Sequence, residues 1–168
     1  FSDCSNLKTL IIKNSTCSIE GDLSTCTALT EYSGPADPFN KYNSSESGSF
    51  STLLEKITLT SGALDRNGLD YINLSYRTLQ EIDLSGIENT NIPDMAFNNC
   101  YKLEKVTLPT QLESVGYKSF AGCTALKGIS LPATVTKIDN SAFEDCRKLE
   151  QILFDGSELK ASTSNLET

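Results

Sequence analysis

A motif that recurs every 23 residues is the feature that most constrains this chain. It begins at Phe97, at Phe120 and at Phe143, and a Cys and then a Leu follow at intervals of three residues. A fixed period of roughly 20 to 50 residues is typical of a solenoid, whose units bury their apolar edges only by stacking. We therefore predict three structural ladders inside the stack. They are Phe97, Phe120 and Phe143; Cys100, Cys123 and Cys146; and Leu103, Leu126 and Leu149.

Weaker copies extend this repeat towards the N-terminus. Units begin near residues 1, 23, 50, 74, 97, 120 and 143, which predicts about seven coils in a single domain spanning residues 1–168. An irregular insertion over residues 33–49 breaks the period, and a polar tail covers residues 155–168. Because the chain opens inside a motif without a polar cap, we expect a fragment of a longer chain. Missing sequence or another chain would then cover the first coil.

Each unit reads as a short strand, a second inward edge and a tight turn. Val106 and Leu108 alternate with Lys105 and Thr107, which predicts a strand whose copies pair in parallel. Leucine and valine at positions 112 and 115 mark the second edge. Capping side chains and acids over residues 139–146 predict a helix of one or two turns. The expected fold class is α/β, with a parallel β-sheet on one face and short helices or 3-10 turns on the other.

Charge and composition exclude several function classes. The chain has 14 Lys and Arg against 22 Asp and Glu, a net charge of -8, which disfavours binding to nucleic acid. No apolar run approaches the roughly 18 residues of a membrane helix, so we expect no membrane insertion within this chain. Histidine is absent from the sequence, which removes the commonest general base and metal ligand. We predict that the chain is not an enzyme and that it needs no cofactor.

The cysteine column leaves three interpretations open. Cys100, Cys123 and Cys146 would stack near disulfide distance, and a thiol cluster could also hold a metal. Their period matches the Phe and Leu columns, however, and a buried free Cys packs as a small hydrophobe. We favour packing. Residues 61–70 faintly resemble a calcium loop but lack its full set of acidic ligands, so we expect a turn there.

The unit Phe-x-x-Cys-x-x-Leu-x-x-Ile/Val-x-Leu-Pro, followed by a second apolar pair and Ala/Ser-Phe, resembles the BspA-type leucine-rich repeat. The glycine common after the second apolar pair in that family is present as Gly116 and replaced by Asp139 in the next unit. The resemblance implies a right-handed leucine-rich-repeat solenoid. It also implies a bacterial protein, secreted or at the cell surface, with a role in adhesion to host proteins or other cells.

Two regions are candidates for binding. The outward side of the strands could form a protein-binding face, and solenoids commonly bind on such extended surfaces. Its candidate residues are Lys56, Thr58, Glu81, Asp83, Lys105, Thr107, Ser130 and Gln151. The insertion is either a plain surface loop or a protruding binding loop that carries Phe39 and Tyr42.

These observations favour an extracellular or cell-surface module that binds a protein ligand, such as a surface protein of the host or of a neighbouring cell. The alternative is a structural spacer or stalk within a larger surface protein. The paired carboxylates Glu81 and Asp83 share the outward face and could in principle perform acid/base chemistry. Such a pair is more often a solvated surface, and no other feature supports catalysis.

Overall fold

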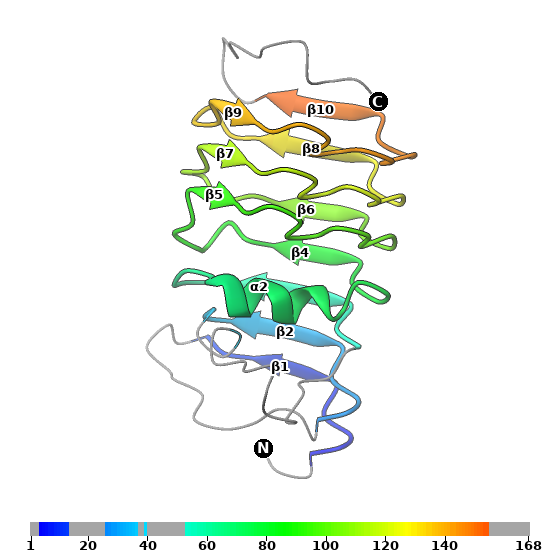
Figure 1. Cartoon of the computed structure of the whole chain (residues 1–168). Helices are drawn as coiled ribbons and strands as arrows, with labels where there is room; N and C mark the ends of the chain where they lie inside the picture. The colour runs from blue at the N-terminus through cyan, green and yellow to red at the C-terminus, as the bar shows by residue number, and fades with distance from the viewer. Residues whose placement is uncertain (1–3, 14–25, 37–38, 40–52, 155–168) are drawn as a thin grey trace.

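A stack of coils forms the molecule in the computed structural model, which describes residues 4–13, 26–36, 39 and 53–154. Each coil contributes one short strand to one side of the stack, which lies away from the viewer in Figure 1 and is called the front side below. These front strands are β1 (Thr9–Ile11), β2 (Glu31–Gly34), β3 (Lys56–Leu59), β4 (Glu81–Asp83), β6 (Lys105–Thr107), β8 (Gly128–Leu131) and β10 (Gln151–Phe154). None of the helices in the described segments is long and apolar enough to cross a membrane.

The front strands pair in parallel, as the sequence predicts, but they do not form one continuous sheet. Strands β1, β2, β3, β4 and β6 make a five-stranded sheet, and β8 pairs with β10 in a separate ladder. Strand β8 still lies against β6 in the stack. The expected run of about seven coils is therefore divided into a sheet of five strands and a ladder of two.

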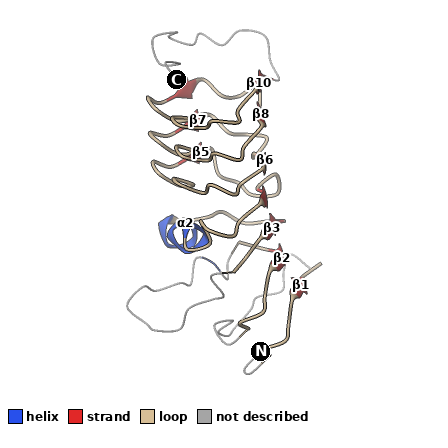
Figure 2. Ribbon diagram, turned by 90° about the vertical axis from the view of Figure 1, so that its right-hand side faces the viewer, coloured by secondary structure: helices blue, strands red, loops and turns tan. Residues whose placement is uncertain are grey.

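A second, smaller sheet lies across the stack from the front strands (Figure 2). It contains β5 (Asn91–Ile92), β7 (Ser114–Val115) and β9 (Lys137–Ile138), which pair in parallel in the order β5-β7-β9. These strands are the second inward edge that the apolar pairs predict. Their apolar members Ile92 and Val115 are buried.

The prediction of a helix over residues 139–146 is wrong, because that segment and its equivalents in the two preceding coils form turns. Two residues of each turn adopt the left-handed conformation, which an α-helix cannot contain. In the last coil they are Ser141 at φ 58° and Asp145 at φ 56°. Their equivalents one coil earlier are Lys118 and Gly122. These turns satisfy their backbone groups partly by bonding to the neighbouring coil rather than within a helix.

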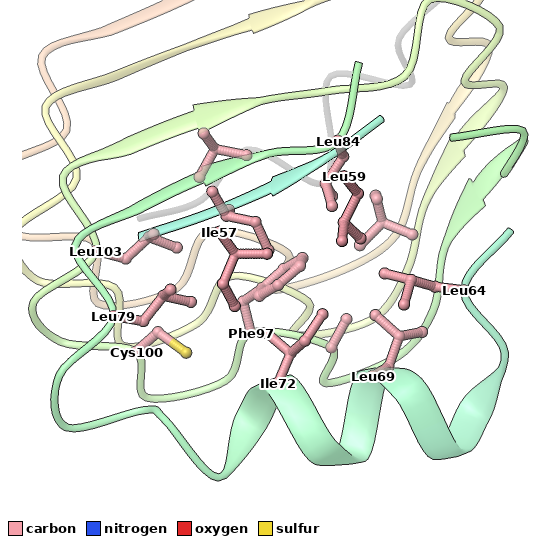
Figure 3. Close-up of a cluster of buried hydrophobic side chains, with 14 of the residues drawn as sticks. Ile57, Leu59, Leu64, Leu69, Ile72, Leu79, Leu84, Phe97, Cys100 and Leu103 are labelled. Atoms are coloured by element: carbon pink, nitrogen blue, oxygen red, sulfur yellow. The ribbon is translucent and has the colours of Figure 1, made fainter. Parts of the chain in front are cut away.

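The structure instead places a helix, α2 (Arg66–Asn73), where we expected only a turn. Asp65 is its N-cap, and its carboxylate accepts a hydrogen bond from Gly68 N at 2.9 Å. A cap of this kind satisfies one of the orphan donors at the start of a helix. Asp70 pairs with Arg66 at 3.0 Å, so two acids of the supposed calcium loop serve the helix itself. Leu69 and Ile72 point from α2 into the core (Figure 3).

The predicted ladders run through the centre of the stack. Phe97 and Phe120 are stacked with ring centroids 5.2 Å apart, and Phe120 and Phe143 stack at 5.5 Å. Phe97, Phe120, Leu103 and Leu126 are fully or almost fully buried. In the last coil the equivalents of these columns, including Phe143 and Leu149, are only partly buried.

The cysteine column is a packing column of free thiols. Cys100 and Cys123 are buried, Cys146 is half-buried, and none forms a disulfide. The thiol of Cys123 donates to the carbonyl of Phe97 at 3.2 Å, and that of Cys146 donates to the carbonyl of Phe120 at 3.1 Å. Burial raises the pKa of Cys100 to about 12 and that of Cys146 to about 11. The described segments contain no group of three metal-binding side chains.

Thiol labelling of the native protein is expected to separate the cysteines by burial. In a Cys17→Ser variant at pH 8, a disulfide reagent should modify the exposed Cys4 rapidly and leave Cys100 and Cys123 unmodified until the protein unfolds. The raised pKa keeps the buried sulfurs as thiols, whereas the thiolate is the reactive form. Mass spectrometry of the labelled peptides measures this order. Rapid native labelling of Cys123 would contradict the packing assignment.

Candidate protein-interaction face

The outward side of the front strands presents its side chains in aligned rows. The parallel register places Thr9, Glu31, Lys56, Glu81 and Lys105 opposite one another in successive strands. A second row holds Ile11, Ser33, Thr58, Asp83 and Thr107. In the separate ladder, Gly128 aligns with Gln151 and Ser130 with Leu153. All eight candidate residues therefore lie on the strands, at the outward positions expected from their alternation with the buried residues.

An ion-pair ladder crosses the middle of this face. The carboxylate of Glu81 lies 3.0 Å from Lys56 Nζ and 2.6 Å from Lys105 Nζ. Hydrogen bonds from Lys105 and then Lys56 lower the pKa of Glu81 below the usual value of a glutamate. Exposed pairs of this kind contribute about 0–1 kcal/mol each, so the ladder orders the side chains more than it stabilises the fold. The result is a fixed plus-minus-plus arrangement over three strands.

Asp83, in the next row of the face, stabilises the turn that follows β4. One of its carboxylate oxygens accepts a hydrogen bond from Ser85 N at 2.9 Å, which closes the turn after β4. Glu81 is held between two lysines, and Asp83 is tied to its own turn. Neither carboxylate is thus kept free for proton transfer, and the pair gives no support to an acid/base site.

Exposed aliphatic side chains stand near both ends of the described front strands. Ile11 of β1 is 58% exposed and Leu153 of β10 is 50% exposed. Phe154, which follows Leu153, is also exposed. The sequence analysis did not select these residues as candidates. The alternation along each strand assigns Ile11 and Leu153 to the outward rows, although neither was chosen as a binding residue.

One residue of the insertion, Phe39, contributes to the core. Phe39 is fully buried, with its ring 4.9 Å from that of Tyr32 and 5.4 Å from that of Tyr71. The expectation that Phe39 is a loop contact is therefore wrong, because its ring fills space between coils. Tyr42 lies outside the described residues.

A patch of tyrosine and arginine lies at the turns that lead into β4 and β6. The rings of Tyr76 and Tyr101 meet edge to face at 6.1 Å, and the guanidinium of Arg77 lies 5.2 Å from the centre of the Tyr76 ring. Tyrosine and arginine are enriched at the centres of protein interfaces. Sequence reasoning missed this patch. Tyr76 precedes Leu79 by three residues, the position that a Cys holds in the later coils.

A family model described as "BspA type Leucine rich repeat region" matches residues 90–166, with 6 copies. This segment contains the three coils with the clearest motif. A search of curated proteins found no match to the sequence.

Solved structures of bacterial leucine-rich repeat proteins are similar to the chain. One is a leucine rich cell surface protein from Faecalibacterium prausnitzii, with 25% identity over 92% of this chain and a TM-score of 0.49. A protein from Bacteroides ovatus has 18% identity over 86% of the chain and a TM-score of 0.45. A third, from T. pallidum, has 23% identity over 59% and a TM-score of 0.41. The chain spans 35%, 54% and 45% of these three proteins, respectively.

Proposed function

From the match of residues 90–166 to the BspA-type leucine-rich repeat, we propose that the chain is a protein-interaction module that binds through the front strands. The observation that carries the proposal is the fixed row Lys56, Glu81 and Lys105, together with the tyrosine and arginine patch at the turns that lead into β4 and β6. A charged row gives orientation and specificity to an encounter, and aromatic anchors supply most of the binding energy. The partner is a protein at the surface of a host cell or a neighbouring cell, so the chain acts outside the cell or at its surface.

Charge reversal on this face is expected to weaken binding at least tenfold. The test compares the parent chain with Lys56→Glu/Lys105→Glu for capture of purified extracellular and cell-surface proteins on an array, followed by titration of each hit. Lys137→Glu is the matched control, since Lys137 is an exposed lysine of the second sheet that also pairs with an acid. Circular dichroism verifies that all three proteins are folded. A hit that binds the parent and the front-face variant equally does not use this face.

The alternative function is a spacer or stalk without a ligand of its own. One observation favours it: both carboxylate oxygens of Glu81, at the centre of the row, are already paired with lysines of the neighbouring strands. A spacer predicts that the array yields no hit at all. It also predicts that the front-face variant and the Lys137→Glu control behave alike when tested in the longer surface protein.

A further inference from the structure

Helix α2 does not supply the hydrogen-bond donors that a regular turn offers to the next coil along the chain. In the regular coils, N–H groups of one turn donate to carbonyl oxygens of the next turn. Met95 N donates to Tyr117 O at 2.9 Å, and Phe97 N donates to Ser119 O at 2.7 Å. Asn99 N donates to Ala121 O at 2.7 Å. The next coil along the chain repeats this pattern: Phe120 N donates to Ala142 O, and Gly122 N donates to Glu144 O, each at 2.8 Å.

These bonds fix the direction of the accepting carbonyls, which point towards the preceding coil. The turn that follows β5 shares the left-handed residues of the later turns, at Met95 and Asn99. Its equivalent carbonyls belong to Asp94, Ala96 and Asn98, and the preceding coil at this place is α2 (Figure 2). Within the described part of the chain, no backbone or side-chain donor meets any of these three carbonyl oxygens. The N–H groups of a helix interior are used within the helix, so α2 cannot supply the missing donors.

A groove of about 210 Å³ lies at this place, between α2 and the turn. Leu69, Asp70 and Asn73 line it from the helix, and Asp94, Met95, Ala96 and Asn98 line it from the turn. Arg66 also lines the groove and pairs with the carboxylate of Asp70 at 3.0 Å. The groove therefore combines three carbonyl oxygens without a protein donor, two carboxylates, one guanidinium and the apolar side chains of Leu69 and Met95.

We propose that this groove binds the guanidinium group of an arginine from a protein partner. A carbonyl that is shielded from water and has no donor costs free energy, which a donor-bearing ligand recovers; Ala96 is buried and Asn98 is half-buried, whereas Asp94 is exposed. Arginine carries five N–H donors in a planar fork and no acceptor, so it can bond to several of these carbonyl and carboxylate oxygens at once. The compact ammonium of lysine cannot span a row of oxygens in the same way. Leu69 and Met95 would pack along the apolar stem of the arginine.

Charge and chemistry support this occupant. The chain has a net charge of -8, and the groove is lined by two carboxylates, Asp70 and Asp94, against one cation, Arg66. The Arg66–Asp70 pair shows that a guanidinium can approach this carboxylate, although the side chains of both residues are more than half exposed. The groove is separate from the front strands, so its occupancy does not depend on the function proposed for them.

The test is an NMR titration of the isotope-labelled chain with N-acetyl-arginine amide. We expect a dissociation constant on the order of 1 mM, as befits so small a ligand, and the largest shifts at the amides of residues 94–98. The citrulline analogue, which lacks the charge, and the lysine analogue should bind at least about tenfold more weakly. Asp70→Asn should weaken arginine binding about tenfold, and Arg66→Ala should strengthen it because a competitor for Asp70 is removed. Asp83→Asn is the matched control on the front sheet and should leave binding unchanged.

Three results would overturn the proposal. The first is equal binding of the arginine and lysine probes, which would reduce the effect to charge alone. The second is unchanged arginine binding in Asp70→Asn when the variant keeps its parent circular dichroism spectrum. The third is a titration with CaCl₂ that saturates the same amides and excludes the arginine probe, because the groove would then be a cation site.

Discussion

Replacing Phe120 by alanine is expected to lower the free energy of unfolding by about 3–5 kcal/mol. The ring is fully buried between Phe97 at 5.2 Å and Phe143 at 5.5 Å, and it is the middle member of the ladder. Alanine would remove the transfer free energy of the ring and leave a cavity that the adjoining coils can close only by moving towards each other. Their spacing is fixed by the parallel pairing of the strands, so little collapse is available.

Urea denaturation, followed by circular dichroism, measures this loss. Phe120→Leu should cost much less, because it keeps most of the apolar volume. Tyr101→Ala is an aromatic control at a half-exposed position and should cost less than Phe120→Ala. Because a solenoid is held together by contacts between neighbouring coils, Phe120→Ala should also lower the slope of the transition, as the two ends of the stack unfold separately. A loss below about 1 kcal/mol would show that the ladder is not the central support of the stack.

The sequence predicted the parts of the fold that repeat. Phe, Cys and Leu at a constant period identified the ladders, and the alternation around Val106 assigned every outward position of the front strands correctly. Both signals are direct consequences of geometry: stacking needs equivalent residues in each coil, and a strand turns successive side chains to opposite faces. The register of the strands followed from the same two signals.

The parts that depend on contacts between coils could not be predicted in this way. The capping side chains around residue 139 suit a helix, yet the left-handed residues Ser141 and Asp145 make a turn. Conversely, α2 is only 8 residues long and has a glycine near its start, so the sequence of the segment signals a helix weakly. The arginine groove could not be predicted from the sequence. It arises because a helix replaces a turn, and the backbone N–H groups that the turn would have offered to the next coil are lost.

Replacing Gly116 by alanine is expected to destabilise the protein by about 1–3 kcal/mol, although the change adds a single methyl group. Gly116 is buried between coils, and a Cβ there would lie 2.7 Å from Asp94 Oδ1 and 2.8 Å from Ile92 O. The contact with Ile92 is to backbone, which cannot move aside as a flexible side chain would. The close contact between the two coils at this position allows two hydrogen bonds. Gly116 N donates to Ile92 O at 2.8 Å, and Tyr117 N donates to Asp94 Oδ1 at 2.9 Å.

Gly128→Ala is the matched control, because its added Cβ would come no closer than 3.4 Å to Gln151 O, which is ordinary contact. That variant should be neutral or slightly more stable, since alanine reduces the freedom of the unfolded chain. Asp94→Ala combined with Gly116→Ala should recover only part of the loss, because the carboxylate is removed while Ile92 O remains. Asp139 carries a side chain at the position equivalent to Gly116 one coil later, so the constraint arises from the contact with Asp94 and Ile92 and not from the repeat itself. Equal stability of Gly116→Ala and Gly128→Ala would show that neighbouring coils separate enough to admit a methyl group. Close stacking would then not be what makes this position select glycine.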